Sequence, residues 1–255
     1  MKVNDIRELS LTSTSKGMLY KCIGNINGKK VYIKTGAKLK NKFSILEPIS
    51  EAIAYEIINK FNIPCAVNYI QEMKLPILER DVLVNVSEDF LQGDESLMSI
   101  RNILGNSSRE ELYNKVVELI PQFRIDIDRM IVMDFLINNI DRHLRNFSVI
   151  VKEGKVIRFA PLYDHGLSIY ADIQDFELEQ DDKENWEMID ECKPFCESHY
   201  EQLELISDVN LPTVKIEDIL DIIDKYKEHL SLHRIECIKF LLEKRYNYLL
   251  EKGIL

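Results

Sequence analysis

Short hydrophobic stretches next to turn-forming residues predict β-strands in the first third of the chain. Two such stretches, Cys22–Ile26 and Lys30–Lys34, flank the dipeptide Asn27–Gly28. This dipeptide tolerates the positive φ angles of a two-residue turn, so we expect an antiparallel hairpin. Val67–Met73 and Val82–Val86 are rich in β-branched and other apolar residues and predict two further strands.

A helix is predicted between these strands, from Ser50 to about Phe61, because Asn62–Pro64 is a stop signal. At about 100° per residue its apolar positions form one broad arc, with Glu51 inside it and Glu56 outside. A carboxylate on the buried side needs a cation, and Lys34 ends the preceding strand. The alternative is that Glu51 only belongs to the charged first turn that the helix dipole favours.

Beyond about residue 90 the hydrophobic spacing becomes that of helices. The predicted elements are a helix after a capping box at Ser108–Glu111, an apolar helix Asp128–Asn139, a hairpin of Phe147–Val151 and Lys155–Phe159 around Glu153–Gly154, and helices Val214–His229 and Arg234–Lys252 in a part that is helical from about Pro194. We therefore predict two packed lobes, residues 1–90 and 91–255, that form one domain with a ligand between them.

Composition limits the classes of protein to consider. Among the 255 residues, 45% are hydrophobic and 30% are charged, which is typical of a globular protein. No apolar run approaches the roughly 18 residues that span a bilayer, and the start lacks a secretory signal, so we expect a cytoplasmic protein. The net charge of −10 disfavours binding to nucleic acid or to an anionic membrane. Cys192, Cys196 and His199 lack the fourth ligand of a structural zinc site.

Polar residues suited to phosphoryl transfer follow the apolar helix. Asp141 and Asn146 are five residues apart, and Asp164 stands just before His165 and Gly166. Protein kinases use an Asp as catalytic base, an Asn five residues later, and a later Asp before Gly to hold Mg²⁺. The predicted hairpin between Asn146 and Asp164 would bring these oxygen ligands together. We therefore predict a phosphotransferase that uses ATP and Mg²⁺, with Asp141 as its base.

Two other segments are candidates for contact with the nucleotide. Thr12–Gly17 is a small polar segment, which would offer hydroxyl and amide groups to phosphate or would form a solvated turn. Its candidate ligands are Ser13, Thr14, Ser15 and Lys16. Val86 and Ser87, at the end of a predicted strand, are the expected residues on the other side of the nucleotide.

Three further residues lie beside the predicted catalytic groups in the sequence. His143 lies two residues after Asp141, so we expect it to orient the loop by a hydrogen bond. Arg142 would either stabilise phosphate or pair with a carboxylate in the core, and the sequence favours neither. His165 replaces the aromatic residue of ordinary protein kinases, so no aromatic-flip switch is expected. The alternative for the whole segment is a polar loop that caps the helix.

Residues Asn138–Ser148 and Ala160–Ser168 resemble the HipA-like kinases, a bacterial family whose catalytic loop is related to that of phosphatidylinositol kinases. Looser similarity extends through Ser50–Glu51, Asn62–Pro64 and Lys193–Phe195. The resemblance implies an α+β, bilobal, protein-kinase-like fold with a strand-rich N-lobe and a mainly helical C-lobe. It also implies ATP-dependent phosphorylation of serine or threonine on proteins.

The resemblance assigns a role to each matched residue. Asp141 would be the catalytic base, Asn146 and Asp164 the Mg²⁺ ligands, Lys34 the phosphate lysine and Glu51 its partner. In several members the kinase is the toxin of a toxin–antitoxin pair, so the expected partners are an unidentified protein substrate and an antitoxin. The competing hypotheses are a small-molecule or lipid kinase and a binding module without activity.

Overall fold

A five-stranded antiparallel sheet forms the first part of the molecule. The computed structural model describes residues 8–14, 17–40, 42–75, 81–104, 111–179, 190–207 and 209–255, with side chains from residue 19 onward. The sheet has the order β1-β2-β3-β7-β6. Its strands are β1 (Glu8–Thr14), β2 (Gly17–Ile26), β3 (Lys29–Thr35), β7 (Asp81–Glu88) and β6 (Asn68–Lys74). Two short strands, β4 (Lys38–Leu39) and β5 (Lys42–Phe43), pair beside it.

The predicted hairpin between β2 and β3 is confirmed. Ile26 pairs with Lys29 across the turn. The intervening Asn27 and Gly28 have φ angles of 54° and 83°, in the left-handed region that this turn requires. The Asn25 side chain accepts a hydrogen bond from the Gly28 amide at 2.9 Å. This turn fixes the register of both strands, and therefore the residues that share each face of the sheet.

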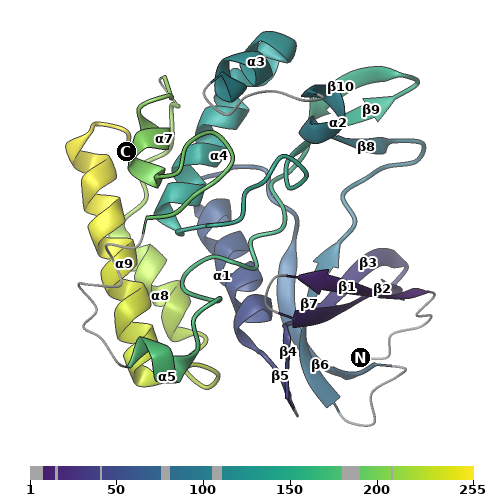
Figure 1. The fold of residues 1–255 in the computed structure, drawn as a ribbon, viewed down its shortest axis with the longest axis vertical. Helices are drawn as coiled ribbons and strands as arrows, with labels where there is room; N and C mark the ends of the chain where they lie inside the picture. The colour runs from purple at the N-terminus through teal and green to yellow at the C-terminus, as the bar shows by residue number, and fades with distance from the viewer. Residues whose placement is uncertain are drawn as a thin grey trace.

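Helix α1 (Leu46–Lys60) lies against β6 and β7 on one side and α8 on the other (Figure 1). It begins four residues before the predicted start at Ser50. Pro48 lies in the first turn, where a missing amide hydrogen costs nothing, and the Ser44 hydroxyl accepts the Leu46 amide. The helix ends before Asn62, which has a φ of 55°, as the stop signal predicted.

The remaining elements form a helical part with a small second sheet. They are β8 (Ser96–Ser99), α2 (Ile100–Leu104), α3 (Leu112–Leu119), a 3₁₀ helix (Pro121–Phe123), α4 (Arg124–Leu136), β9 (Ser148–Lys152), β10 (Lys155–Phe159), α5 (Asp175–Leu178), α7 (His199–Leu203), α8 (Ile216–Asp224) and α9 (Leu232–Glu251). The second sheet has the order β10-β9-β8, and its β9–β10 hairpin turns at Glu153 and Gly154 as predicted.

Several predicted boundaries in this part are wrong. The apolar helix was expected to begin at Asp128, but α4 begins at Arg124, directly after the 3₁₀ helix. The helix expected to reach His229 ends at Asp224. The segment after Pro194 was expected to be helical throughout, but α7 begins only at His199. The predicted capping residue Ser108 lies outside the described residues, and α3 begins at Leu112 with no side-chain cap.

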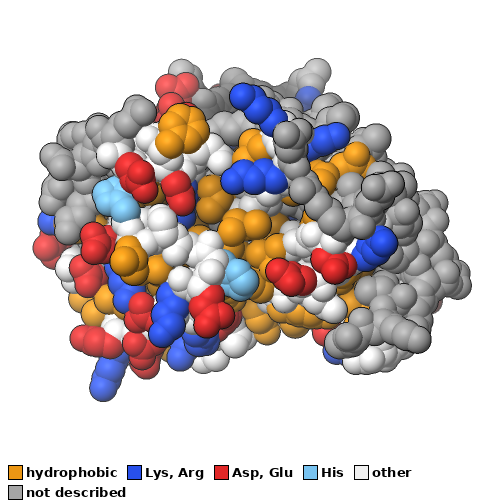
Figure 2. Space-filling model, turned by 90° about the horizontal axis from the view of Figure 1, so that it is seen from below, with side chains coloured by type: hydrophobic (Ala, Val, Ile, Leu, Met, Phe, Trp, Pro, Cys, Tyr) orange, Lys and Arg blue, Asp and Glu red, His pale blue; other side chains and the backbone are white. Residues whose placement is uncertain are grey.

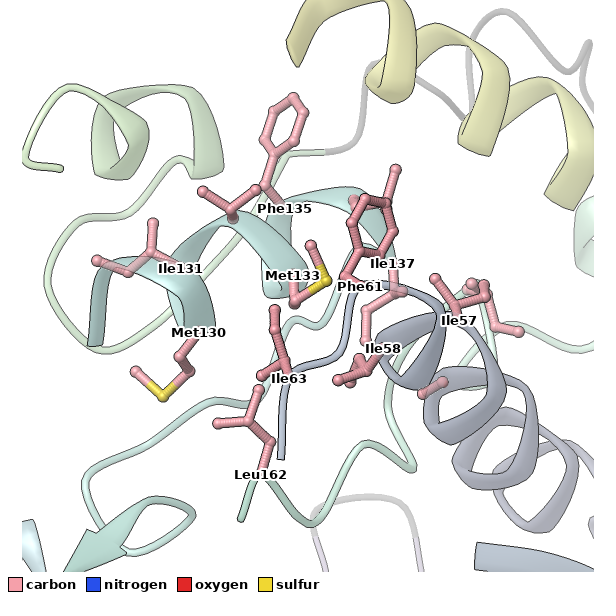
Figure 3. Packing of buried hydrophobic residues seen from close by; sticks show 14 of the residues in the cluster. Ile57, Ile58, Phe61, Ile63, Met130, Ile131, Met133, Phe135, Ile137 and Leu162 are labelled. Atoms are coloured by element: carbon pink, nitrogen blue, oxygen red, sulfur yellow. The ribbon is translucent and has the colours of Figure 1, made fainter. Parts of the chain in front are cut away.

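One continuous hydrophobic core joins α1 to the helical part. Figure 3 shows Ile57 and Ile58 of α1, and Phe61 just after it, close to Met133 of α4 and to Ile137, which follows that helix. The same cluster continues into α8 and α9, whereas the outer face of the sheet has a separate cluster around Val31 and Ile33. Helix α1 is therefore held on its side facing away from the sheet by the core of the helical part. The lobe boundary near residue 90 stays a prediction.

The underside of the molecule mixes residue types. Figure 2 shows hydrophobic side chains in the middle of this face, with acidic and basic side chains on both flanks. Within the part of the chain that the structure describes, no helix is both long enough and apolar enough to cross a membrane.

Candidate active site

Two adjoining cavities lie between the five-stranded sheet and the loop that follows α4. Their volumes are about 420 Å³ and about 180 Å³. Four charged residues line both of them: Lys21, Lys34, Glu51 and Asp164. The larger cavity has a volume within the range of small-molecule sites. A charged ligand that occupies both cavities would meet these four groups where the cavities join.

Lys34 of β3 is the centre of this charge cluster. Its Nζ lies 2.7 Å from Asp164 Oδ1 and 3.4 Å from Glu51 Oε1. Burial alone would lower the pKa of Lys34, but the two carboxylates outweigh it and raise that pKa. Burial alone would likewise raise the pKa of Asp164, but Lys34 lowers it to well below its usual range. The predicted contact between Lys34 and Glu51 is present, and the Lys34–Asp164 pair is charged at neutral pH.

Glu51 links α1 to the segment that contains Asp164. It is only 3% exposed, as its position inside the apolar arc predicted. Oε1 faces Lys34, and Oε2 accepts the backbone amide of His165 at 3.0 Å. The hydroxyl of the preceding residue, Ser50, lies 3.0 Å from the carbonyl oxygens of both His165 and Ser168, and its single hydrogen is shared between them. Ser50 is therefore an anchor for this segment rather than the start of the helix.

Glu56 is not the bare surface residue that the helical phase predicted. It forms an ion pair with Lys225, and the Tyr226 hydroxyl donates to it at 2.8 Å. Both partners come directly after Asp224, the last residue of α8. The side of α1 opposite Glu51 is thus tied to the helical part of the molecule, which helps to fix the orientation of Glu51.

Arg142 resolves the alternative that the sequence left open, because it pairs with a carboxylate in the core. Its side chain is 0% exposed and donates to Asp134 Oδ2 and Oδ1 of α4 at 2.8 and 2.9 Å. It also donates to the carbonyl oxygens of Asn146 at 2.7 Å and Tyr163 at 2.6 Å. Arg142 therefore fastens the loop after α4 to the residue just before Asp164.

Asp141 lies at the edge of the smaller cavity and is partly exposed. Its Oδ1 is 2.7 Å from Lys193 Nζ, a residue that comes from the loop before α7. The Asn146 side-chain amide donates to the Asp141 carbonyl oxygen at 3.0 Å. His143 accepts the Arg145 amide at Nδ1, at 3.3 Å, which agrees with the expected role of orienting the loop.

Asn146 and Asp164 both line the smaller cavity, and Asn146 is buried. The Asn146 amide nitrogen faces the backbone of Asp141, so its oxygen faces the other way. Asp164 has a φ of 63°, unusual for a residue with a side chain and frequent where function holds the backbone in a strained form. One carboxylate and one amide oxygen that line the same cavity suit Mg²⁺, which prefers hard oxygen ligands.

His165, the residue after Asp164, is fully buried. Burial first, and then the charge of Arg142, lower the pKa of its imidazole well below the usual value. The ring is therefore neutral at physiological pH. The described residues contain no group of three or more His, Cys, Asp and Glu that would hold a metal ion, so Cys192, Cys196 and His199 form no such site.

Not every residue predicted to contact a nucleotide lines the cavities. Ser87 does, but Val86 is fully buried in the hydrophobic cluster on the outer face of the sheet. Side chains alternate between the two faces of a strand, so Ser87, opposite Tyr32, faces the cleft and Val86, opposite Ile33, faces away from it.

The predicted phosphate segment is only partly described. Ser13 and Thr14 are the last residues of β1, paired with Met18 and Gly17, and therefore belong to a strand rather than to the predicted loop. Ser15 and Lys16, between β1 and β2, lie outside the described residues.

Two lysines near the site were not predicted. Lys21 lies directly across from Lys34 in the β2–β3 pair and lines both cavities. Burial first, and then Lys34, lower the pKa of its ammonium group. The Asn27–Gly28 turn would have identified Lys21, because it determines which residue faces Lys34. Lys193 belongs to the segment Lys193–Phe195 that resembles the HipA-like kinases, but no turn or periodicity places it beside Asp141, which it reaches from a distant part of the chain.

This sheet, the helix α1 beside it and the cleft below define a protein with a kinase-like fold. The chain belongs to the family described as the HipA-like C-terminal domain, whose model matches residues 28–230. The resemblance seen in the sequence and the α+β, bilobal, kinase-like fold class are thereby confirmed.

Solved structures agree with this assignment. The crystal structure of CtkA, a proinflammatory kinase of Helicobacter pylori, is 17% identical, with 95% of this chain and 92% of that chain covered and a TM-score of 0.73. At this identity the similarity shows the fold. The PAN3 pseudokinase of Neurospora crassa is 13% identical over 99% of this chain and 66% of that chain, but its TM-score of 0.32 is too low to support an argument. No curated protein matches the sequence.

Proposed function

We propose that this protein is a kinase that transfers the γ-phosphoryl group of ATP to a serine or threonine hydroxyl of a protein. The observation that carries the proposal is the position of Lys34, which contacts Glu51 and Asp164 at the junction of the two cavities. A lysine held by a helix glutamate is the group with which kinases bind nucleotide phosphates. Membership of the HipA-like family supports the same conclusion.

The residues of the cleft suit each part of the reaction. Asp141 would accept the proton of the acceptor hydroxyl while the hydroxyl oxygen forms a bond to the γ-phosphorus. The bond between that phosphorus and the β,γ-bridging oxygen breaks, and ADP leaves with the electron pair. Lys34, oriented by Glu51, would bind the phosphates. Mg²⁺, held by Asn146 and Asp164, would neutralise phosphate charge.

The adenine base would occupy the larger cavity. Ser87 to Leu91, where the chain leaves β7, line it together with Tyr32 and Ile23. This mixture of apolar and aromatic side chains with a few polar groups is typical of a pocket for a flat heterocycle. The phosphates would then extend toward Lys34 and the smaller cavity.

The choice of a protein acceptor rests on the resemblance to the HipA-like kinases. A net charge of −10 disfavours anionic lipid surfaces and nucleic acid as binding partners. We infer that the protein acts in the cytoplasm on a protein substrate, with an antitoxin as a candidate partner.

The test is the transfer of label from γ-labelled ATP in the presence of Mg²⁺, with a protein extract or with small hydroxyl compounds as acceptors. We expect labelled protein, and Asp141→Asn should lower the rate by about 10²- to 10⁴-fold with an unchanged circular dichroism spectrum. Asp221→Asn, an exposed change of the same type on α8, is the control.

Each other result points to a different function. Label found only in small compounds would refute the protein acceptor. ATP binding with no transfer to any acceptor would indicate a binding module. Activity of Asp141→Asn within a few-fold of the parent would remove Asp141 from its assigned role.

A further inference from the structure

Lys193 contacts the residue assigned as catalytic base, although it lies far from it in the sequence. Its Nζ is 2.7 Å from Asp141 Oδ1, and the lysine side chain is 51% exposed. An exposed ion pair of this kind adds little to stability, because two flexible chains must be ordered in water. The contact between Lys193 and Asp141 therefore contributes little to the stability of the fold, and its effect is on the charge within the cleft.

The backbone around Lys193 is held firmly. On one side, the Cys192 amide donates to the Glu197 carbonyl oxygen at 2.9 Å. On the other side, Phe195 is buried and its amide donates to the Gln202 side chain at 3.1 Å. A residue fixed in this way carries its side chain to a reproducible place.

The same segment packs against the catalytic loop. The Phe195 ring contacts Phe147, the residue after Asn146, with 6.1 Å between ring centroids. It also contacts Tyr113 of α3, with 5.4 Å between centroids. Lys193 and Asp141 therefore lie on two segments that share one aromatic contact, so their ion pair follows from the packing of the core.

Two other cations of the cleft are engaged with carboxylates other than Asp141, while Lys21 lines both cavities and, in the part of the chain that the structure describes, forms no ion pair with Asp141. Arg142, beside Asp141 in the sequence, is buried and donates to Asp134 and to two backbone carbonyls. Lys34 is bound between Glu51 and Asp164. Among the described residues, the cation that forms an ion pair with Asp141 is Lys193.

The geometry of in-line transfer brings the γ-phosphoryl group close to this cation. A general base lies about 2.6–3.2 Å from the hydroxyl whose proton it accepts. That hydroxyl oxygen must in turn approach the phosphorus to about 3–3.5 Å before reaction. The long, flexible stem of a lysine lets an ammonium group beside Asp141 span the remaining distance to a γ-phosphate oxygen.

We propose that Lys193 is a further catalytic residue of this site, whose ammonium group binds the γ-phosphoryl group of ATP during transfer. This inference rests on the proposed kinase function. Before ATP binds, Lys193 pairs with Asp141. In the complex it reaches a γ-phosphate oxygen and offsets the negative charge that the phosphoryl group would otherwise present to the Asp141 carboxylate. No proton is transferred by Lys193, and the bonds formed and broken are those of the kinase reaction.

The test compares the binding of ADP with that of the non-hydrolysable β,γ-imido analogue of ATP, by calorimetry with Mg²⁺. Lys193→Met should weaken binding of the analogue by about 10- to 100-fold and change ADP binding by less than about twofold, because only the analogue carries a γ-phosphate. Lys193→Arg should restore part of the difference. Turnover should fall by a similar factor. Lys227→Met, a change of the same type at an exposed residue that lines neither cavity, is the control.

The outcomes separate this inference from the proposed function. If the parent protein binds neither nucleotide, the proposed function is wrong and the role of Lys193 falls with it. If the parent binds both, and Lys193→Met keeps the parent's preference between them, only the role of Lys193 is overturned. A purely structural role would weaken both nucleotides equally and lower the melting temperature, and that result would also overturn the inference.

Discussion

Replacing Arg142 by Met should separate the stability of the fold from the arrangement of the catalytic loop. The guanidinium is 0% exposed and makes four hydrogen bonds, two to Asp134 and one each to the carbonyl oxygens of Asn146 and Tyr163. Arg142→Met leaves the Asp134 carboxylate buried without its cation. Breaking a buried pair in this way costs about 3–5 kcal/mol.

A second substitution removes the part of that cost that comes from the unpaired charge. Asp134→Asn in the Arg142→Met background eliminates this charge but keeps an acceptor for Asn139, which in the parent donates to Asp134 at 2.9 Å. The carbonyl oxygens of Asn146 and Tyr163 still lack their donor, which leaves a cost of about 1–3 kcal/mol for each. The double variant should therefore be more stable than Arg142→Met but should not recover its activity.

Urea unfolding and labelled-ATP transfer measure the two effects separately. For a chain of this length each kcal/mol corresponds to about 2–4 °C, so Arg142→Met should melt about 6–20 °C below the parent. A loss of stability below about 1 kcal/mol would mean that the pair is not as buried as described. Full activity in the double variant would show that Arg142 does not position the loop.

Three further predictions follow from the same contacts. Lys34→Ala and Glu51→Gln should each lower turnover, and the double variant should be hardly slower than either, because the two residues act as one unit. A double-mutant cycle measures this coupling. The control is Glu72→Gln, a change at an exposed residue, because Glu56 is bound to Lys225 and Tyr226. Asp164→Ala should abolish the gain in ATP affinity that Mg²⁺ gives, and titration with and without chelator tests it. Burial, and then the charge of Arg245, lower the pKa of His199 in the folded protein. Below about pH 6.5 the His199 imidazole therefore binds a proton in the unfolded chain but not in the folded one. Stability should then fall by up to about 1.4 kcal/mol per pH unit, and His199→Gln should flatten this dependence of the urea midpoint; an unchanged slope would contradict it.

Local patterns were enough to predict the elements closest to the chemistry. The Asn27–Gly28 turn gave the β2–β3 hairpin, and the helical phase gave the burial of Glu51 and its contact with Lys34. Both depend on residues close in sequence, where periodicity determines geometry. The start of α1 was misjudged because Ser50 has the form of a capping residue, while its hydroxyl binds a distant segment.

The contacts that cross the chain were harder to predict. Lys193 reaches Asp141 through tertiary packing, and no period or turn signals it. A partner for Arg142 was easier to anticipate, because Asp134 is the one charged residue in the otherwise apolar stretch Met130–Leu136 of α4, and a buried acid there requires a cation. The predicted roles of Asp141, Asn146 and Asp164 in catalysis stay predictions until the variants are measured.

The residues of the two hydrophobic clusters are not grouped by their order in the sequence. Helix α1 comes early in the sequence, yet its apolar residues join the larger cluster, while Lys34 belongs to a strand whose outer face has its own cluster. The ion pair between Lys34 and Glu51 therefore joins two elements whose apolar side chains lie largely in different clusters, although α1 also packs directly on β6 and β7. A shift of α1 against the sheet would change the distance between these two side chains. That distance is thus a gauge of how α1 sits against the strand that contains Lys34.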